Sequence, residues 1–451
     1  MKSRLLLTFS SICLTALVTP LQVAAQGPNS QHLRYTVTDL GPTNDTAFSQ
    51  ATFVANNGVT TGLTLNPDFT QHAVLWHKGR ITDLGTPGLG GQNSGAFGVN
   101  GKGEVVGQAE SSNLDSNNEN FCGYGTGLEC LPFLWEDGTI TALQLLGGNN
   151  GTVGVINNRG EVAGIAETDI RDAQCPSGVA VNGTGPQVLD FEAVVWGPRR
   201  GQVRMLTPLP GDSVGIALGM NDKGQVVGAS GSCANTVLPG FAAAPHAVLW
   251  DTDGSVHDLG NLGGTVNTGL LAVGNVAEAI NNHGHIVGVS ALPGNQSIHA
   301  FLWTNETGIQ DLGTLSGDVY SAGLGINDRG DVVGASIDGN PANGNPRAYL
   351  RRNGVMIDLN SLVQADAPLY LLTAFAINDA GEIAGFGVNS TGDIHAFLAI
   401  PCGKENNSDS LGLDEQSGSS EVRRVLSESS RNQLQNLLRV HPPADRQLAP
   451  Q

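Results

Sequence analysis

Residues 299–334 read HAFLWTNETGIQDLGTLSGDVYSAGLGINDRGDVVG, and this stretch decides the fold because versions of it recur along the chain. Its first segment, HAFLW, has relatives whose starts lie about 48 to 61 residues apart. They are HAVLW at His72 and His246, PFLW at Pro132, AVVW at Ala193, RAYL at Arg347 and HAFLA at His395. All five tryptophans occupy one position of this segment, namely Trp76, Trp135, Trp196, Trp250 and Trp303.

Three further segments follow HAFLW in each copy. The second reads ITDLG at Ile81, VHDLG at Val256, IQDLG at Ile309 and MIDLN at Met356. The third and fourth are joined by a turn, as in INDRGDVVG from Ile326 and INNRGEVAG from Ile156. Two glycines lie four residues apart in this unit, at 58/62, 103/107, 160/164, 224/228, 284/288, 330/334 and 381/385.

Each segment is typical of a short β-strand, because it is rich in Val, Ile, Leu and Phe and is bounded by Gly, Asn and Asp. Four strands in about 50 residues are typical of one propeller blade, and seven glycine pairs predict seven blades. Tyr35–Gly41 is a DLG strand with no HAF strand before it, and His395–Ile400 is a HAF strand with no DLG strand after it. We therefore predict an all-β, seven-bladed propeller that the N-terminal strand closes by pairing into the last blade.

The long motif HAFLW…DLG…GIND.G.VVG resembles the bacterial HAF-type probable extracellular repeat family over about residues 35–400. The resemblance implies an exported bacterial protein with a propeller-like array and no established activity. The chain departs from the pattern where TALQ and VRML replace DLG, and where Arg351 and Ala399 replace Trp.

Composition agrees with many tight turns and argues against nucleic-acid binding. The chain has 451 residues, of which 62 are Gly and 14% are charged. Forty-one acids oppose 22 bases, so the chain lacks the basic excess that phosphate binding uses.

The first 25 residues are predicted to be a signal peptide. Lys2 and Arg4 precede an apolar run, and small residues end it at Ala25, so cleavage is expected between Ala25 and Gln26. A membrane anchor is the alternative, but Ser, Thr and Pro interrupt the run, and no other stretch is long enough to span a bilayer. Export to the periplasm, cell surface or medium follows, and cleavage would leave 20 bases against 41 acids, a formal charge of −21.

Long insertions separate the VVG and HAF segments in three successive blades, at 109–131, 167–192 and 229–245, with a shorter one at 337–346. They connect the second and third strands of their blades, so they are expected on one face of the ring, where function is expected. Four of the five mature cysteines lie in them, and we predict the disulfides Cys122–Cys130 and Cys175–Cys233. A metal site is disfavoured because the spacing lacks CxxC, and Cys402 is left over.

The repeat ends near residue 400. Residues 403–451 form a polar tail, in which 421–440 has one apolar helical face. This segment is a marginal helix on a mobile tail or a helix that docks on the propeller or a partner.

Most residues with potential chemistry are explained by their place in the repeat. His72, His246, His299 and His395 each begin a HAF strand, and Asp222, Asp328 and Asp379 lie in Asn-Asp turns without calcium-loop spacing. His283 and His285 are a weak metal pair, and Arg329-Gly330-Asp331 falls where the repeat requires a turn. The sequence contains no HExxH or P-loop motif, and we assign no catalytic residue, metal ligand or cofactor.

Three functions remain open. We favour a non-enzymatic, monomeric exported propeller that binds a glycan, peptide or protein through its insertion-bearing face. The second is a hydrolase or lyase acting on extracellular polymer, with catalytic acids among Asp115, Glu119, Asp169, Asp172 and Asp190. The third is a purely structural envelope protein. Carboxylates and a base converging over the central channel would favour the enzyme.

Overall fold

A computed structural model describes residues 33–402, except for 44–47, 87, 176–178, 181–182, 185, 200, 239–240, 243, 266–273 and 340–345. The predicted signal peptide with its Ala25–Gln26 cleavage site and the tail from 403, including 421–440, lie outside the described residues. The chain divides into two units, Met1–Leu33 and Arg34–Gln451, and every strand lies in the second. None of the helices in the described residues is long and apolar enough to cross a membrane.

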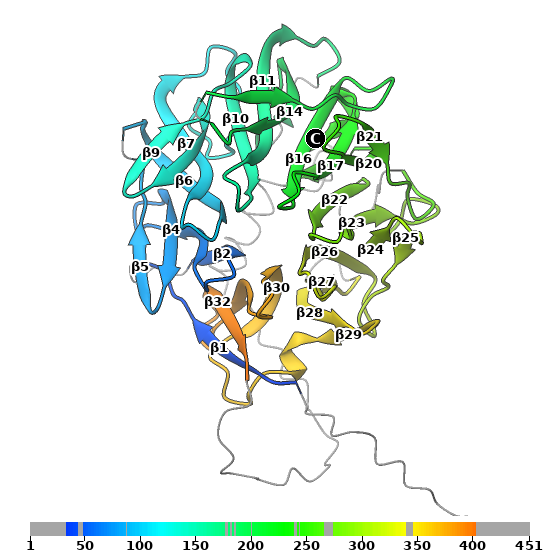
Figure 1. The fold of residues 1–451 in the computed structure, drawn as a ribbon. Helices are drawn as coiled ribbons and strands as arrows, with labels where there is room; N and C mark the ends of the chain where they lie inside the picture. The colour runs from blue at the N-terminus through cyan, green and yellow to red at the C-terminus, as the bar shows by residue number, and fades with distance from the viewer. Residues whose placement is uncertain are drawn as a thin grey trace, which may run out of the picture. The chain divides into compact units, whose positions relative to one another are not determined.

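The second unit is a seven-bladed β-propeller, as the repeat predicts, with seven antiparallel four-stranded sheets that follow one another around a ring (Figure 1). The blades, each from its inner to its outer strand, are β2 (Ser49–Val54), β3 (Thr60–Leu65), β4 (Gln71–His77), β5 (Arg80–Asp83); β6 (Gly90–Val99), β7 (Val105–Leu114), β8 (Leu128–Glu136), β9 (Thr139–Ala142); β10 (Gly147–Ile156), β11 (Val162–Arg171), β14 (Leu189–Trp196), β15 (Val203–Met205); β16 (Val214–Met220), β17 (Val226–Gly231), β20 (His246–Trp250), β21 (Val256–Asp258); β22 (Val276–Ile280), β23 (Ile286–Ala291), β24 (Ile298–Thr304), β25 (Gly308–Asp311); β26 (Tyr320–Ile326), β27 (Val332–Ile337), β28 (Pro346–Arg352), β29 (Val355–Asp358); and β30 (Tyr370–Ile377), β31 (Ile383–Val388), β32 (Ile394–Pro401), β1 (Tyr35–Asp39). We number these sheets blades 1 to 7 in that order.

Small elements decorate the blades. They are the strand pairs β12 (Val179–Ala180) with β13 (Gly183–Thr184) and β18 (Val237–Leu238) with β19 (Phe241–Ala242), the short helix α1 (Cys233–Thr236) and the 3₁₀ turn η1 (Leu359–Ser361).

The N-terminal strand completes the last blade. β1 pairs antiparallel with β32, with Tyr35 opposite Pro401 and Asp39 opposite Phe397. The seven inner strands also contact one another in a closed cycle, from β2 round to β30 and back to β2. The predicted pairing of the two chain ends is therefore present, and β32 does not lie at an open edge.

The glycine pair of the repeat has two physical causes. The first glycine ends the turn between inner and second strands with a positive φ, for example 78° at Gly330. The second lies in the second strand, where a Cβ at Gly334 would come within 1.8 Å of the carbonyl oxygen of Ala322 on the inner strand. Residues other than glycine are strained at the first position and collide with backbone at the second, so all blades keep both.

The asparagine of each Ile-Asn-Asp turn holds neighbouring blades together. Asn327 Oδ1 accepts the backbone N–H groups of Arg329 and Asp331, and its Nδ2 donates to the carbonyl of Asn378 in the next blade. Six residues make this bond to the following blade, and we call them the asparagine girdle: Asn100, Asn157, Asn221, Asn281, Asn327 and Asn378.

The residue after each girdle asparagine adds a second row of bonds. Asp328 Oδ1 accepts the backbone N–H of Asn282, and Asp379 Oδ1 accepts that of Asp328. Both rows change between blades 1 and 2, because Ala55 replaces the girdle asparagine and Gly101 has no side chain. Asn57 Nδ2 instead donates to the Gly101 carbonyl across this boundary.

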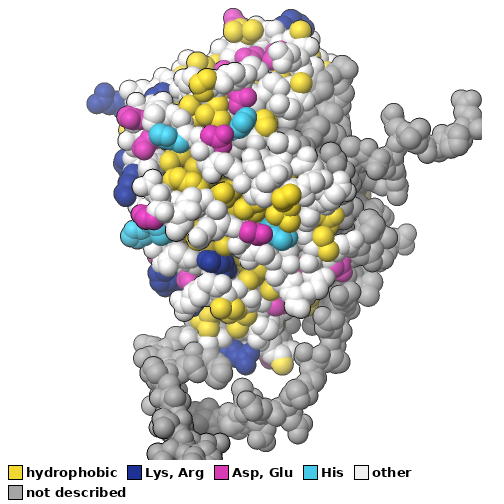
Figure 2. Space-filling view, turned by 90° about the vertical axis from the view of Figure 1, so that its right-hand side faces the viewer, with side chains coloured by type: hydrophobic (Ala, Val, Ile, Leu, Met, Phe, Trp, Pro, Cys, Tyr) yellow, Lys and Arg dark blue, Asp and Glu magenta, His cyan; other side chains and the backbone are white. Residues whose placement is uncertain are grey.

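The repeated histidines also have a structural partner. His72 Nδ1 lies 2.8 Å from an oxygen of Asp83 on the neighbouring outer strand, and this carboxylate raises the pKa of His72. The same pair recurs as His246–Asp258, His299–Asp311 and His395–Asp39, with Arg347–Asp358 in blade 6. Imidazole and acidic side chains lie side by side in Figure 2.

Strand lengths in blades 2 and 3 differ from those of the other blades. The glycine-rich strings at 88–91 and 147–151 lie partly or wholly in strands, since β6 begins at Gly90 and β10 begins at Gly147. The inner and second strands of blades 2 and 3 reach ten residues, because the second strands extend into the insertions and the inner strands pair with them there. The outer strands β9 and β15 form although TALQ and VRML replace DLG.

Candidate functional site

The insertions connect second to third strands, so they lie on the face opposite the asparagine turns, which connect first to second strands. In blades 2, 3 and 4 these connections occupy residues 115–127, 172–188 and 232–245. We call this side the insertion face. The described part of it is a cross-linked layer rather than a set of independent loops.

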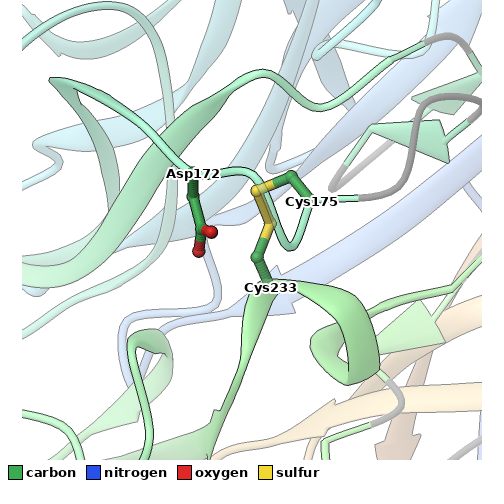
Figure 3. Close-up of side chains that lie close together, drawn as sticks. All are labelled: Asp172, Cys175 and Cys233. Carbon is green, nitrogen blue, oxygen red and sulfur yellow. A yellow bond between two sulfur atoms is a disulfide. The ribbon is translucent and has the colours of Figure 1, made fainter.

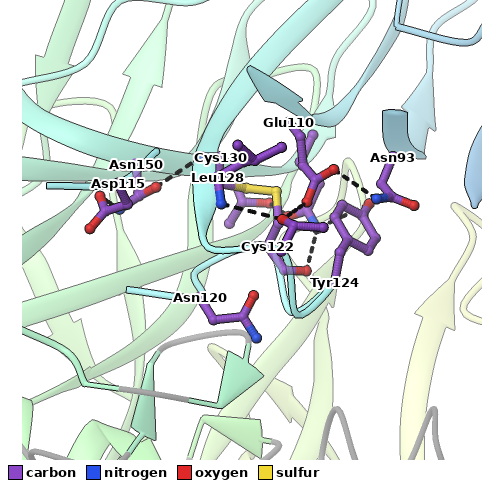
Figure 4. Close-up of a disulfide and its surroundings, with 12 residues drawn as sticks. Asn93, Glu110, Asp115, Asn120, Cys122, Tyr124, Leu128, Cys130 and Asn150 are labelled. Carbon is purple, nitrogen blue, oxygen red and sulfur yellow. Dashed lines mark hydrogen bonds between the residues drawn. A yellow bond between two sulfur atoms is a disulfide. The ribbon is translucent and has the colours of Figure 1, made fainter. Parts of the chain in front are cut away.

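The blade 2 insertion is closed by the predicted disulfide between Cys122 and Cys130, whose Cα atoms are 5.3 Å apart. Both cysteines are buried beside Tyr124 (Figure 4). Gln108 Nε2 donates to the Cys122 carbonyl, and Gln108 Oε1 accepts the hydroxyl of Thr152 in blade 3. The insertion is therefore anchored both to its own blade and to the next.

Three acidic side chains, Asp115, Glu119 and Glu167, converge on Asn150 at the boundary between blades 2 and 3. Asn150 Nδ2 lies 3.1 Å from Asp115 Oδ2, 3.0 Å from Glu167 Oε2 and 3.4 Å from Glu119 Oε2. Glu119 Oε1 also accepts the backbone N–H groups of Val188 (2.6 Å) and Leu189 (3.1 Å). The carboxylate of Glu119 thus joins the blade 2 insertion to the blade 3 insertion.

No Lys, Arg or His side chain of the described residues bonds to this cluster. Glu119 and Glu167 are each 0% exposed. Burial raises the pKa of both carboxyls, and the charge of Glu119 raises that of Glu167 further. With its pKa raised to about 8, Glu167 is the carboxyl expected to hold a proton near neutral pH.

The second predicted disulfide joins blades 3 and 4. Cys175 follows β11 and Cys233 begins α1, with Cα atoms 4.8 Å apart, and Asp172 lies beside them (Figure 3). Each sulfur is bonded to the other, so neither is a free thiolate ligand. Cys402 is free and exposed, 3.5 Å from the hydroxyl of Thr36.

Blade 3 departs from the histidine–aspartate pattern at Glu192. This residue stands at the HAF histidine position, and Met205 stands where the outer-strand aspartate would be. Glu192 is 8% exposed, and its buried Oε2 has no hydrogen-bond partner in the described residues; the same holds for Asp190 Oδ1. Burial and the neighbouring Asp190 raise the pKa of Glu192 to about 8, and burial raises that of Asp190 to about 6.

Exposed apolar side chains stand on the insertion face of three successive blades. Phe69 lies between β3 and β4, Leu114 ends β7, and Ile170 lies near the end of β11. Their exposed fractions are 80%, 75% and 60%. Asp68 and Asp169, beside Phe69 and Ile170 in the chain, are exposed acids.

Phe69 also occupies a backbone position that the protein otherwise reserves for glycine. Ten turns of the described residues share two backbone bonds, from residue 1 N–H to residue 5 C=O and from residue 4 N–H to residue 1 C=O. Nine have glycine at residue 4, namely Gly58, Gly103, Gly160, Gly224, Gly254, Gly284, Gly330, Gly381 and Gly392, and the tenth has Phe69. With φ at 67°, Phe69 is in the left-handed region that bulky residues rarely adopt.

The structure does not bring most of the remaining candidate residues together in one site. Asp331 of the Arg-Gly-Asp triplet is buried and bonded to Arg352, at 2.8 and 2.7 Å. The backbone N–H groups of His283 and His285 donate to Asn281 of the girdle. The sequence analysis did not identify Glu167 and Glu192 as buried acids or Phe69 as an exposed aromatic residue. Of the three, only Phe69 could have been found from the sequence, because it stands where the other turns have glycine.

No protein family model matches the chain, and no curated protein sequence matches it. The solved structures that resemble it include an acylaminoacyl peptidase from Pyrococcus horikoshii (11% identity, TM-score 0.45, covering 78% of this chain and 51% of the peptidase). TolB from Acinetobacter baumannii has 13% identity and a TM-score of 0.36, covering 76% of this chain and 63% of TolB. A Xanthomonas campestris gluconolactonase has 9% identity and a TM-score of 0.34, covering 83% of this chain and 98% of that enzyme.

The chain thus spans about half the length of the peptidase and less than two thirds of TolB. We draw no argument from similarities this distant, and the resemblance to the HAF-type repeat family stays a prediction.

Proposed function

We propose that this protein is an exported, non-enzymatic binding module that captures a peptide or protein segment on its insertion face. The observation that carries the proposal is Phe69, an aromatic side chain that is 80% exposed at a position where nine equivalent turns have glycine. A left-handed conformation costs a residue with a Cβ about 1–2 kcal/mol. The exposed ring gains no packing in return, so a contact with a partner is the physical reason that best accounts for it.

The surroundings of Phe69 indicate the chemistry of the partner. Leu114 and Ile170 add exposed apolar area on the same face, and Asp68 and Asp169 add negative charge next to it. A partner segment with apolar side chains flanked by Lys or Arg complements this pattern better than a glycan does. The rigid, cross-linked layer beneath limits the entropy lost on binding.

Three of the five acids offered as catalytic residues favour binding over catalysis. Asp115 and Glu119 are buried and committed to Asn150 and to backbone N–H groups. Asp190 lies beside the buried acid Glu192, and the described residues place no base next to this pair. A hydrolase requires a carboxyl that a substrate can reach and a second group to accept or donate the proton.

Export rests on the predicted signal peptide and agrees with two disulfides, which form in oxidising compartments. The resemblance to the HAF-type extracellular repeat family supports the same location.

Selection of peptides from a random library on the immobilised mature protein tests the proposal. Fluorescence polarisation of the selected peptides should show at least a tenfold loss of affinity for Phe69→Gly and little change for Val355→Ala, a 59% exposed apolar site that adjoins a third-to-fourth strand turn. Selected peptides that bind both variants equally, or a library that yields no binder, would count against the proposal. Turnover of a polymer substrate that one carboxylate substitution abolishes would replace it with an enzymatic function.

A further inference from the structure

The interior edge of the ring carries a single charged side chain. The seven inner strands, β2, β6, β10, β16, β22, β26 and β30, contain no Lys, Arg, His or Asp and only one Glu, Glu278 in β22. Nothing in the repeat explains this residue, since the other six strands have an uncharged residue at the equivalent position.

That equivalent position is a β-bulge. Each inner strand has a register shift against its second strand at the residue three before the turn asparagine or its counterpart. The bulge residues are Thr52, Phe97, Gly154, Leu218, Glu278, Leu324 and Phe375. A bulge leaves its extra residue outside the ladder and turns the side chain away from the regular alternation.

These seven residues reach solvent at the axis of the ring. All are partly exposed, although the residue before each is buried. An inner strand packs against neighbouring blades on both faces and pairs with the second strand along one edge, so its remaining edge faces the axis. Neighbouring inner strands lie close together around the axis. A Cβ at Gly219, for example, would lie 2.7 Å from the carbonyl oxygen of Glu278 in the next blade.

Apolar residues occupy four of the other six bulges, with Thr52 and Gly154 at the remaining two. Leu218 and Leu324 occupy the bulges of the two adjacent blades, and Phe97 and Phe375 occupy two others. No hydrogen bond or ion pair to the Glu278 carboxylate occurs within the described part of the chain.

We propose that Glu278 and the apolar bulge residues around it form a binding site for an organic cation, a primary ammonium group on an apolar body. The ammonium group would pair with the carboxylate, and the leucine and phenylalanine side chains would contact the apolar body, with cation–π attraction from the rings. This site is separate from the insertion-face residues that carry the proposed peptide binding.

Burial raises the pKa of Glu278 to about 7, so ligand binding and proton release are linked. The strands packed against β22 are β16, β17, β20, β23 and β26. Their titratable groups are His246, which is bonded to Asp258, and Tyr320, so no Asp, Glu, Lys or Arg on these strands alters the titration near neutral pH. A cation binds the ionised carboxylate, so affinity should rise with pH up to about 7 and then level off.

Calorimetric titration of the full chain with benzylamine, which is protonated at these pH values, tests the site, with benzyl alcohol as the neutral counterpart. We expect saturable benzylamine binding at pH 8, about thirtyfold weaker binding at pH 5.5 from the titration of Glu278, and at least tenfold weaker binding of benzyl alcohol. Glu278→Gln should weaken benzylamine binding at least tenfold. Glu306→Gln, an exposed acid of the same blade, should leave it unchanged.

A melting curve at pH 8 shows whether Glu278→Gln is folded, and Glu278→Leu, which copies the adjacent bulges, provides a second variant. Three results would overturn the site: no saturable binding to the unaltered protein at pH 8, binding by both Glu278 variants as tight as that of the unaltered protein, or equal binding of alcohol and amine. Loss of peptide binding by Phe69→Gly is independent of every one of these results.

Discussion

The asparagine-turn face and the insertion face belong to the same seven sheets, but only the first obeys the repeat. On the turn face, each girdle asparagine caps its own turn and bonds the next blade, and the pattern changes only between blades 1 and 2. On the insertion face, Glu119 and Glu192 are buried with no Lys, Arg or His bonded to them in the described part of the chain, and Phe69 replaces glycine. The comparison shows that the contacts of the turn face stabilise the fold. The insertion face holds residues that reduce stability, so their presence requires an explanation other than folding.

The largest expected effect on this comparison comes from the disulfides, which stabilise the insertion face. Removing Cys175–Cys233, which closes a separation of 58 residues, should lower the free energy of unfolding by about 4 kcal/mol, and removing Cys122–Cys130, with a separation of 8, by about 2.5 kcal/mol. Urea unfolding of the two double Cys→Ala variants measures both, with Cys402→Ala as the neutral control. Equal losses would show that loop length does not set the contribution.

The turn face should lose stability when one girdle asparagine is removed. Asn327→Ala loses the bond to the Asn378 carbonyl and two caps, for about 2–3 kcal/mol. Asn389→Ala removes the same caps, to Thr391 and Asp393, from a turn of the insertion face without a bond to another blade, for about 1 kcal/mol. Urea unfolding compares the two, and equal losses would mean that the girdle does not join the blades.

Blade 3 should become less sensitive to pH when its acid is neutralised. The folded pKa of Glu192 is raised to about 8, so the folded state holds a proton that the unfolded state releases, and stability falls as pH rises from about 5 to 8. Glu192→Gln should remove this loss, a gain of up to about 4 kcal/mol at pH 8. Urea unfolding between pH 5 and 8 measures it, with Glu306→Gln as the control.

Restoring the histidine–aspartate pair in blade 3 should reverse the direction in which stability changes with pH. In Glu192→His with Met205→Asp, a histidine with a raised pKa should stabilise the fold most below its unfolded pKa and lose that stabilisation as pH rises. The same pH dependence in all three proteins would show that Glu192 does not cause it.

The smallest expected effect on stability comes from replacing Phe69, the strained residue of the insertion face. Phe69→Gly should raise the free energy of unfolding by about 1 kcal/mol, since glycine adopts a positive φ without strain. Thermal or urea unfolding checks this, and Phe69→Asn should give a similar gain. A loss of stability in both variants would show that the exposed ring contributes to folding.

The sequence predicted what every blade shares and missed what crosses a boundary once. Glycine pairs and Asn-Asp turns predicted seven blades, because each copy imposes the same backbone, and equivalent loop positions predicted Cys175–Cys233. The contacts of Glu119 with Asn150 and Val188 depend on how one insertion crosses to the next blade, which no local pattern encodes. Alignment of Asn66-Pro-Asp-Phe-Thr70 with Asn389-Ser-Thr-Gly-Asp393 would have singled out Phe69.

These two turns also provide the most direct test that the insertion face binds a partner through Phe69. The double variant Phe69→Gly with Gly392→Phe moves the aromatic ring from blade 1 to the equivalent turn of blade 7, with the composition and the number of strained residues unchanged. The affinity of peptides selected on the unaltered protein, measured by fluorescence polarisation, should fall at least tenfold in this variant while its melting temperature stays the same. Unchanged affinity with the ring in blade 7 would contradict the account, because binding would then not depend on where the strained phenylalanine stands.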